Sequence, residues 1–142
     1  LYTEITALVQ LLQRIHAAKQ LVIDWYAPEQ ALVFDREDLL ELIGTLADNA
    51  CKWARQHVQI DVHVNGELLV CVADDGPGLS PEKLASLGVR GQREDESVPG
   101  HGLGLAIVRD IVELAGGELC FALSPRWGGL EVTARVPLAR PI

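Results

Sequence analysis

The sequence has no long apolar run and few basic residues. It contains no stretch of about 18 consecutive apolar side chains, which a membrane-spanning helix requires. Leu1-Tyr2-Thr3-Glu4 lacks the basic-then-apolar pattern of a targeting signal. The 12 basic and 20 acidic residues give a net charge of −8, which argues against a nucleic-acid partner because binding to DNA or RNA needs clustered Lys and Arg. We therefore expect a soluble segment that contacts neither membrane nor nucleic acid.

Cysteine is scarce as well. The three cysteines, Cys51, Cys71 and Cys120, are odd in number and widely spaced in apolar surroundings. This pattern favours buried thiols in a reducing cytoplasm over a disulfide framework or a zinc site. With 49% hydrophobic residues, the 142-residue chain can bury a proper core. We predict one domain of the α/β or α+β class over residues 1–142.

Periodicity of the apolar residues predicts an alternation of helices and strands. Helical spacing predicts helices over 5–18, 35–55, 81–87 and 103–114. Runs rich in β-forming residues predict strands over 21–26, 31–34, 58–64, 68–73, 118–123 and 130–136. We expect the first two strands to form a hairpin, and the next two to pair antiparallel through Asn65-Gly66, a strong hairpin signal.

A polar stripe lies inside the helix predicted over 35–55. Thr45, Asn49 and Lys52 follow one another at steps of four and three residues, so they share one helix face. The oxygen of an Asn amide is a hard ligand that suits Mg²⁺, and a Lys one turn later can reach phosphates that accompany the metal. Taken alone, the stripe would be interpreted as an ordinary solvated helix face.

A second motif, Asp74-Asp75-Gly76-Pro77-Gly78, directly follows a predicted strand. A carboxylate at a strand end can accept a hydrogen bond from an exocyclic amine, and the two glycines allow a flat ring to approach the backbone. Such a geometry would recognise adenine. The alternative is an acidic turn without a ligand, because Asp and Gly are common turn residues.

A third motif, Gly100-His101-Gly102-Leu103-Gly104-Leu105, opens a predicted helix. Free backbone N–H groups and the helix dipole at such a position form an anion site, which predicts bound phosphates. A dinucleotide-binding fingerprint does not fit, because the third glycine comes one residue early and a polar loop precedes the motif instead of a strand. The sequence has no P-loop either.

In this order, the three motifs resemble the N, G1 and G2 boxes of the GHKL ATPase/kinase superfamily, which includes gyrase B, Hsp90, MutL and the sensor histidine kinases. The segments DNACKWA, DDGPG, RGQR and GHGLGLAIV look most like histidine kinases of the PhoQ type. The resemblance implies a Bergerat-type fold, a two-layer α/β (α+β) sandwich with a mixed, mostly antiparallel sheet covered on one face by helices. It also implies an ATP-binding catalytic domain that phosphorylates a histidine.

The resemblance assigns roles to individual residues. It implies that Asn49 coordinates Mg²⁺, Lys52 contacts phosphate, Trp53 lines the nucleotide and Asp74 recognises adenine. The stretch 87–101 would be the ATP lid, with Arg93 as a third catalytic residue beside Asn49 and Lys52. The remaining nucleotide contacts would be Gly76, Gly78, Arg90, Gly91, Gln92, Gly100, His101, Gly102, Leu103, Gly104 and Leu105. Arg90 and Arg93 can also be interpreted as solvated charges among acidic neighbours.

Thr45 departs from the family pattern. Histidine kinases commonly carry Asn four residues before the metal-binding Asn, whereas the hydrolysing relatives carry a Glu that acts as a general base for water. A threonine hydroxyl is a poor base at neutral pH, so attack by water is expected to be slow. Thr45 therefore favours a kinase over an ATPase.

The chain offers no histidine suited to be the phosphoacceptor. In histidine kinases, this residue lies in a helix and is followed by an acidic residue and then Pro, and His16, His57, His63 and His101 lack that setting. The resemblance thus implies a helical hairpin elsewhere, in cis or in a dimer partner, and a response regulator receiver domain. The parent would be a homodimeric inner-membrane sensor, and this fragment a monomeric cytoplasmic domain.

Three other functions remain open from the sequence. The chain could be an ATP-hydrolysing machine of the gyrase, Hsp90 or MutL kind, an anti-sigma-factor serine kinase, or a regulatory module that binds nucleotide without transferring phosphate.

Overall fold

The computed structural model describes residues 2–28, 34–88 and 103–138. These residues form a five-stranded sheet in the order β1-β2-β3-β5-β4. The strands are β1 (Val22–Tyr26), β2 (His57–Val64), β3 (Glu67–Asp74), β4 (Glu118–Leu123) and β5 (Leu130–Pro137). β1 runs parallel to β2, and the other neighbouring pairs are antiparallel. The predicted mixed, mostly antiparallel sheet is therefore confirmed.

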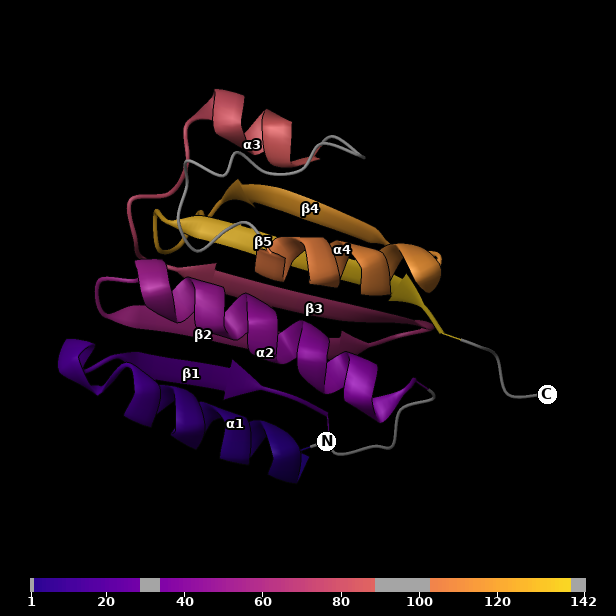
Figure 1. Cartoon of the computed structure of the whole chain (residues 1–142), viewed down its shortest axis with the longest axis horizontal. Helices are drawn as coiled ribbons and strands as arrows, with labels where there is room; N and C mark the ends of the chain where they lie inside the picture. The colour runs from indigo at the N-terminus through magenta and orange to yellow at the C-terminus, as the bar shows by residue number, and fades with distance from the viewer. Residues whose placement is uncertain (1, 29–33, 89–102, 139–142) are drawn as a thin grey trace.

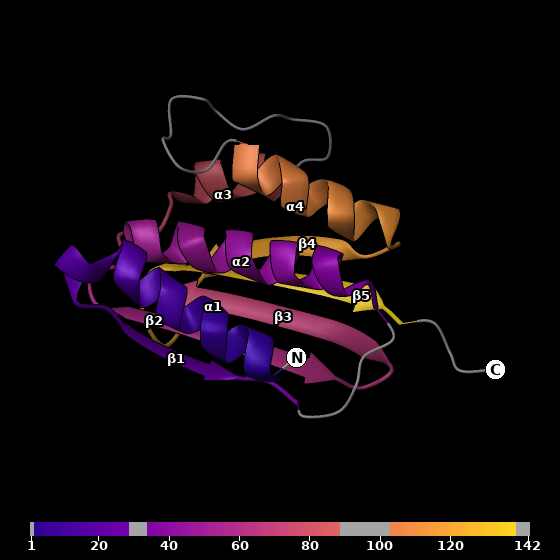
Figure 2. The ribbon, with the colours of Figure 1, turned by 60° about the horizontal axis from the view of Figure 1, so that its bottom comes forward.

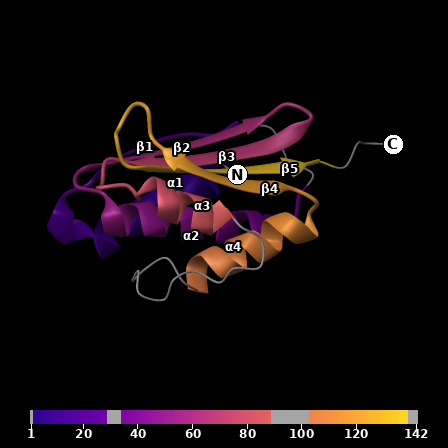
Figure 3. The ribbon, with the colours of Figure 1, turned by 90° about the horizontal axis from the view of Figure 1, so that it is seen from above.

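The helices lie on one face of this sheet (Figures 1 and 3). They are α1 (Tyr2–Ile15), α2 (Arg36–Trp53), α3 (Pro81–Gly88) and α4 (Leu103–Leu114). α2 lies between α1 and α4 and packs on the middle of the sheet (Figure 2). None of the helices in the described ranges is long and apolar enough to cross a membrane. The result is the predicted two-layer sandwich.

The hairpin of β2 and β3 forms where the sequence alternates. Every second residue of β2 faces the helices and is buried, as Val58, Ile60 and Val62 illustrate. The turn is closed by a hydrogen bond from the Asn65 N–H to the Glu67 carbonyl, with Gly66 at a φ of 74°. Since this signal is local, the sequence predicted the hairpin correctly.

α2 begins and ends for identifiable reasons. The Asp35 carboxylate accepts a hydrogen bond of 2.9 Å from the Asp38 N–H and so caps the first turn. The helix ends at Trp53 because Ala54 turns to an extended conformation, with a ψ of 146°. Its buried face, including Leu42, Ile43 and Leu46, packs into the core.

One expectation needs correction, and another stays a prediction. β1 pairs with β2 in parallel, because α2 returns the chain across the sheet between the two strands. Most of its predicted hairpin partner over 31–34 lies outside the described residues. The expected burial of the thiols holds for Cys51, but Cys71 is half-buried and Cys120 is exposed, since both alternate along their strands with residues on the better-covered face of the sheet.

Candidate functional site

A pocket lies between α2 and the sheet, at the end of the molecule where β3 ends and β5 begins. Its mostly apolar lining comes from α2, α4, β3 and β5, and consists of Leu46, Asn49, Ala50, Trp53, Val72, Asp74, Leu105, Leu130 and Val132. The pocket is partly open to solvent, and its cavity volume is about 10 Å³, roughly the site of one water molecule. A larger ligand would thus require the walls to move apart.

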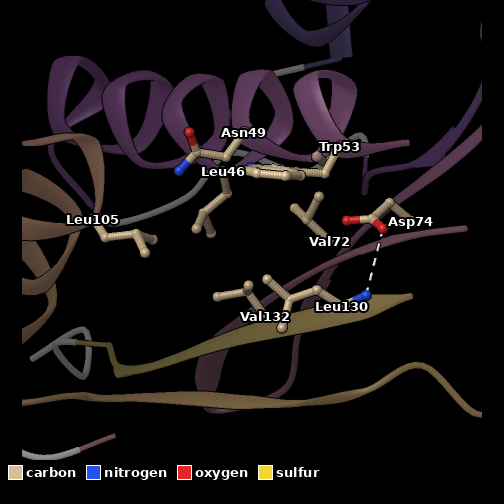
Figure 4. A pocket seen from close by; sticks show the side chains of 9 residues that line it. Leu46, Asn49, Trp53, Val72, Asp74, Leu105, Leu130 and Val132 are labelled. Carbon is tan, nitrogen blue, oxygen red and sulfur yellow. Dashed lines mark hydrogen bonds between the residues drawn. The ribbon is translucent and has the colours of Figure 1, made fainter. Parts of the chain in front are cut away.

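Asp74 is the charged residue of this pocket, and only 2% of it is exposed. Its Oδ1 accepts hydrogen bonds from the Gly76 N–H at 2.8 Å and the Leu130 N–H at 3.4 Å. The other carboxylate oxygen points towards Val72 and the interior of the pocket (Figure 4). One oxygen is therefore held by the backbone, and the other is directed at a ligand position.

Burial dominates the electrostatics of Asp74. Desolvation raises the pKa of its carboxyl above the ordinary 3.8, and the negative charge of Asp75 adds to the rise. The hydrogen bonds from Gly76 and Leu130 and the charge of Lys19 oppose it. Any further hydrogen-bond donor would stabilise the charged form of this buried carboxylate. Such a perturbed group is typical of a ligand-binding site.

Two glycines allow the backbone around Asp74 to pack so closely. A Cβ atom on Gly76 would lie 2.3 Å from the Trp53 carbonyl oxygen, and one on Gly129 would lie 2.3 Å from both the carbonyl oxygen and Oδ1 of Asp74. Gly78, also predicted for the site, has a φ of +70° that favours glycine. Gly76 and Gly78 were identified from the sequence, whereas Gly129 was not singled out.

Asn49 lies at the other end of the pocket. In Figure 4, Asn49 and Asp74 occupy opposite ends, with Trp53 between them. Asn49 is 8% exposed, and its buried Nδ2 has no hydrogen-bond partner among the described residues. An amide can present either its oxygen or its nitrogen after rotation, so this group is open to a ligand or to a metal.

Lys52, predicted to share a polar helix face with Asn49, does not itself line the pocket. Its side chain is 47% exposed, and Nζ lies 3.4 Å from Asp48 Oδ2. The Oδ1 of the same carboxylate lies 2.9 Å from His16 Nε2. Within the stripe, Asn49 is buried at the pocket and Lys52 lies at the solvent edge.

Asp75 binds the end of α2 to the end of β3. Its Oδ1 accepts hydrogen bonds from the Arg55 N–H at 2.8 Å and the Gln56 N–H at 3.0 Å, and its Oδ2 lies 3.3 Å from His57 Nδ1. Burial alone would raise the pKa of Asp75, but hydrogen bonds from Gln56, His57 and Arg55 lower it overall. The second Asp of the motif is thus structural.

The remaining predicted residues lie mostly outside the described part of the chain. This applies to Arg90, Gly91, Gln92, Arg93, Gly100, His101 and Gly102, and to most of the predicted lid over 87–101. Leu103 and Gly104 are in the first turn of α4, whose predicted start is confirmed. Leu105 is 2% exposed and lines the pocket.

Residues 34–140 match the model of the histidine kinase-, DNA gyrase B- and HSP90-like ATPase family. The chain belongs to this family. Membership confirms the resemblance found in the sequence and the predicted ATP-binding class of domain. The match begins just before α2 and covers the rest of the sheet, so every described residue that lines the pocket falls within it.

Relatives within this ATPase family are sensor kinases. The chain is 46% identical to the sensor protein kinase CarS of Pseudomonas aeruginosa over 96% of its own length, and 35% identical to the sensor histidine kinase PhoQ of Salmonella typhimurium over 79%. It spans only 31% and 23% of these two proteins. A structure of the mycobacterial sensor histidine kinase MprB matches with a TM-score of 0.77 and 25% identity, covering 99% of this chain and 95% of that one. These relatives support the prediction of a histidine kinase catalytic domain.

Proposed function

We propose that this domain binds ATP in the pocket between Asp74 and Asn49 and transfers the γ-phosphoryl group to a histidine on a separate dimerisation helix. The observation that carries the proposal is the buried Asp74, one of whose oxygens is held by two backbone N–H groups while the other faces the pocket. A response regulator receiver domain would then take the phosphoryl group from the histidine.

The Asp74 end suits adenine. The inward oxygen of a buried carboxylate is a strong acceptor for the exocyclic amine, and the apolar walls formed by Val72 and Leu130 suit a flat ring. Trp53 adds an aromatic side chain next to that ring position. Since Asp74 and Asn49 lie at opposite ends, a nucleotide with its base at Asp74 can direct its phosphates towards Asn49.

The Asn49 end suits the phosphates and Mg²⁺. Asn49 has a buried amide whose Nδ2 lacks a partner among the described residues, and after rotation such an amide could offer its oxygen to a metal. Mg²⁺ keeps several waters and binds through few protein ligands. When bound, Mg²⁺ would neutralise charge on the phosphates. Lys52, now paired with Asp48, is close enough along α2 to turn to them, and Arg93 and the Gly100–Leu105 motif remain proposed contacts from the sequence.

Phosphoryl transfer to another segment is favoured over hydrolysis. Thr45 stands one turn before Asn49 and cannot activate water as a carboxylate would. The described histidines are engaged elsewhere, His16 with Asp48, His57 with Asp75, and His63 stacked on Tyr26. The acceptor would lie on a helical hairpin in cis or in a dimer partner, in a homodimeric parent at the inner membrane whose cytoplasmic part includes this domain.

The adenine contact is tested by replacing Asp74 with Asn. Because the backbone N–H groups would hold the amide oxygen, the amide NH₂ would face the amine of adenine as a second donor. Because a charge-assisted hydrogen bond is lost, we expect the affinity for Mg²⁺-ATP, measured by calorimetry, to fall at least about tenfold. Asp24→Asn, at an exposed position on β1, is the matched control and should bind like the wild type. Equal affinity of all three proteins would refute the adenine site.

The transfer step needs a separate experiment. The wild-type domain, Mg²⁺-ATP and the separately expressed dimerisation hairpin of the parent should yield acid-labile phosphohistidine on the hairpin. Asn49→Ala should abolish the product. If ATP binds but no phosphohistidine forms, or if the isolated domain steadily releases phosphate, the kinase proposal fails in favour of a regulatory module or an ATPase.

A further inference from the structure

The segment between α1 and β1 packs against the last turn of α2. It consists of a short 3₁₀ turn, Ala17–Lys19, followed by Gln20 in a left-handed conformation with a φ of 52°. That turn directs the Lys19 side chain at α2, and its Nζ donates hydrogen bonds to the carbonyls of Cys51 at 2.9 Å, of Ala54 at 3.2 Å, and of Lys52. A single ammonium group thus binds three carbonyls at one helix end.

These carbonyls belong to the helix end that most needs a donor. The last four C=O groups of a helix have no partner inside it, and they form the negative end of the helix dipole. Lys19 supplies both hydrogen-bond donors and a positive charge at that end. The nearby Val22 N–H donates a hydrogen bond of 2.7 Å to the Gln56 carbonyl. The packing of this segment against the end of α2 therefore continues beyond the helix.

The turn that Lys19 holds is the one that carries the proposed nucleotide contacts. Lys52 and Trp53 lie in it, and Asn49 lies one turn earlier. Directly after this turn, the Arg55 and Gln56 N–H groups donate hydrogen bonds to Asp75. Lys19 and Asp75 therefore both hold the end of α2, one through carbonyls and the other through N–H groups.

We propose that Lys19 is a positioning residue for the nucleotide site, because its ammonium group holds the last turn of α2 where Lys52 and Trp53 can meet the ligand. This inference rests on the proposed ATP binding and deepens it. Lys19 itself touches no nucleotide in this proposal. Its removal would leave three carbonyls without their donor, and the last turn would unwind or shift, so the two side chains would have to be ordered again on binding.

The test is Lys19→Met, with Lys19→Arg as the conservative variant and Arg14→Met as the matched control. Arg14 is an exposed cation on α1, so its loss removes the same charge without touching α2. Calorimetry with Mg²⁺-ATP is done at a temperature where circular dichroism shows every variant folded. We expect Lys19→Met to bind about threefold to tenfold more weakly, Lys19→Arg to recover most of the loss, and Arg14→Met to match the wild type.

A purely structural cap gives a different result. It would lower the unfolding temperature of Lys19→Met but leave the affinity of the folded protein unchanged, and that outcome would overturn the inference. A double-mutant cycle combines Lys19→Met with Lys52→Met. If Lys19 positions Lys52, then Lys52→Met costs less ATP affinity in the Lys19→Met background than in the wild type. Additive losses of affinity would contradict the inference. Failure of the wild type to bind Mg²⁺-ATP would instead refute the proposed function and the inference with it.

Discussion

Gly129 shows how strongly a single backbone position can determine the site. It follows the turn between β4 and β5, and the next residue, Leu130, donates its N–H to Asp74. Any side chain at position 129 would meet the atoms of Asp74 that the site depends on. The orientation of the carboxylate therefore depends on close contact between two backbones that meet only in the folded sheet.

We predict that Gly129→Ala both destabilises the protein and weakens ATP binding. The new Cβ would lie 2.3 Å from two Asp74 oxygens and 2.7 Å from the Gly76 N, so the backbone must move. Such overpacking costs about 1–3 kcal/mol in the free energy of unfolding. Urea unfolding and calorimetry measure the two effects.

Gly44→Ala is the control for this prediction. A Cβ there makes ordinary contact with Leu8 at 3.7 Å, and Ala is the better helix former by about 1 kcal/mol. Its stability should be equal or higher, with unchanged ATP affinity. If Gly129→Ala also kept the stability and the ATP affinity of the wild type, close packing of Gly129 on Asp74 would not be what orients the carboxylate.

At the residue scale, the sequence predicted what residue chemistry implies and missed what only proximity creates. Asp74 and Asn49 could be singled out because their motifs stand in the order of the family's boxes, although each motif alone has an ordinary interpretation. Gly129 and Lys19 carry no such signal, since a glycine in a turn and a lysine after a helix are common. Their importance comes from contacts with α2 and β3 that are distant in sequence.

At the scale of elements, α2 and β3 form the site together, and Asp75 joins them. The sequence could predict both elements, since α2 has clear helical periodicity and β3 belongs to a local hairpin. It did not predict the parallel pairing of β1 with β2, because the partners are separated by the whole of α2 and local patterns do not encode such pairing. Nor did it predict that Asp75 would fix the relative position of α2 and β3.

We predict that Asp75→Asn lowers the free energy of unfolding by about 1.5–3 kcal/mol at neutral pH, since hydrogen bonds to a charged acceptor weaken. The folded-state pKa of Asp75 lies below its ordinary 3.8, so the carboxylate stabilises fully above pH 3.8. That stabilisation is lost as the pH falls through the lowered pKa. The stability gap between wild type and variant should therefore shrink below pH 3.8.

Urea unfolding from pH 7 to pH 3 measures this gap. Asp24→Asn removes an exposed carboxylate from β1 and should change stability by less than about 0.5 kcal/mol. A gap for Asp75→Asn that stayed constant across the acidic range would show that its carboxylate charge does not hold α2 to β3.

At the scale of the whole molecule, the pocket couples ligand binding to global stability. Its walls come from α2, α4, β3 and β5, so a bound nucleotide would join both helices to the sheet. Since the cavity between them measures only about 10 Å³, a bound base would have to widen it. A ligand that binds only the folded state raises stability by mass action, and the site chemistry determines which ligand does so.

We predict that Mg²⁺-ATP raises the unfolding temperature and that Mg²⁺-GTP does not. At about one hundred times its Kd, a ligand adds about 2.7 kcal/mol, which for a domain of this size shifts the midpoint on the order of 10 °C. Guanine places a carbonyl oxygen where adenine has its amine, and that oxygen would face the inward oxygen of Asp74 with no proton between them. Asp74→Asn presents a donor there instead, so this variant should lose most of the temperature shift caused by ATP. The difference between the ATP and GTP shifts should also become smaller. Asp24→Asn should keep the wild-type ATP shift and the wild-type difference between the nucleotides. Equal shifts with ATP and GTP in the wild type would mean that Asp74 does not recognise the base.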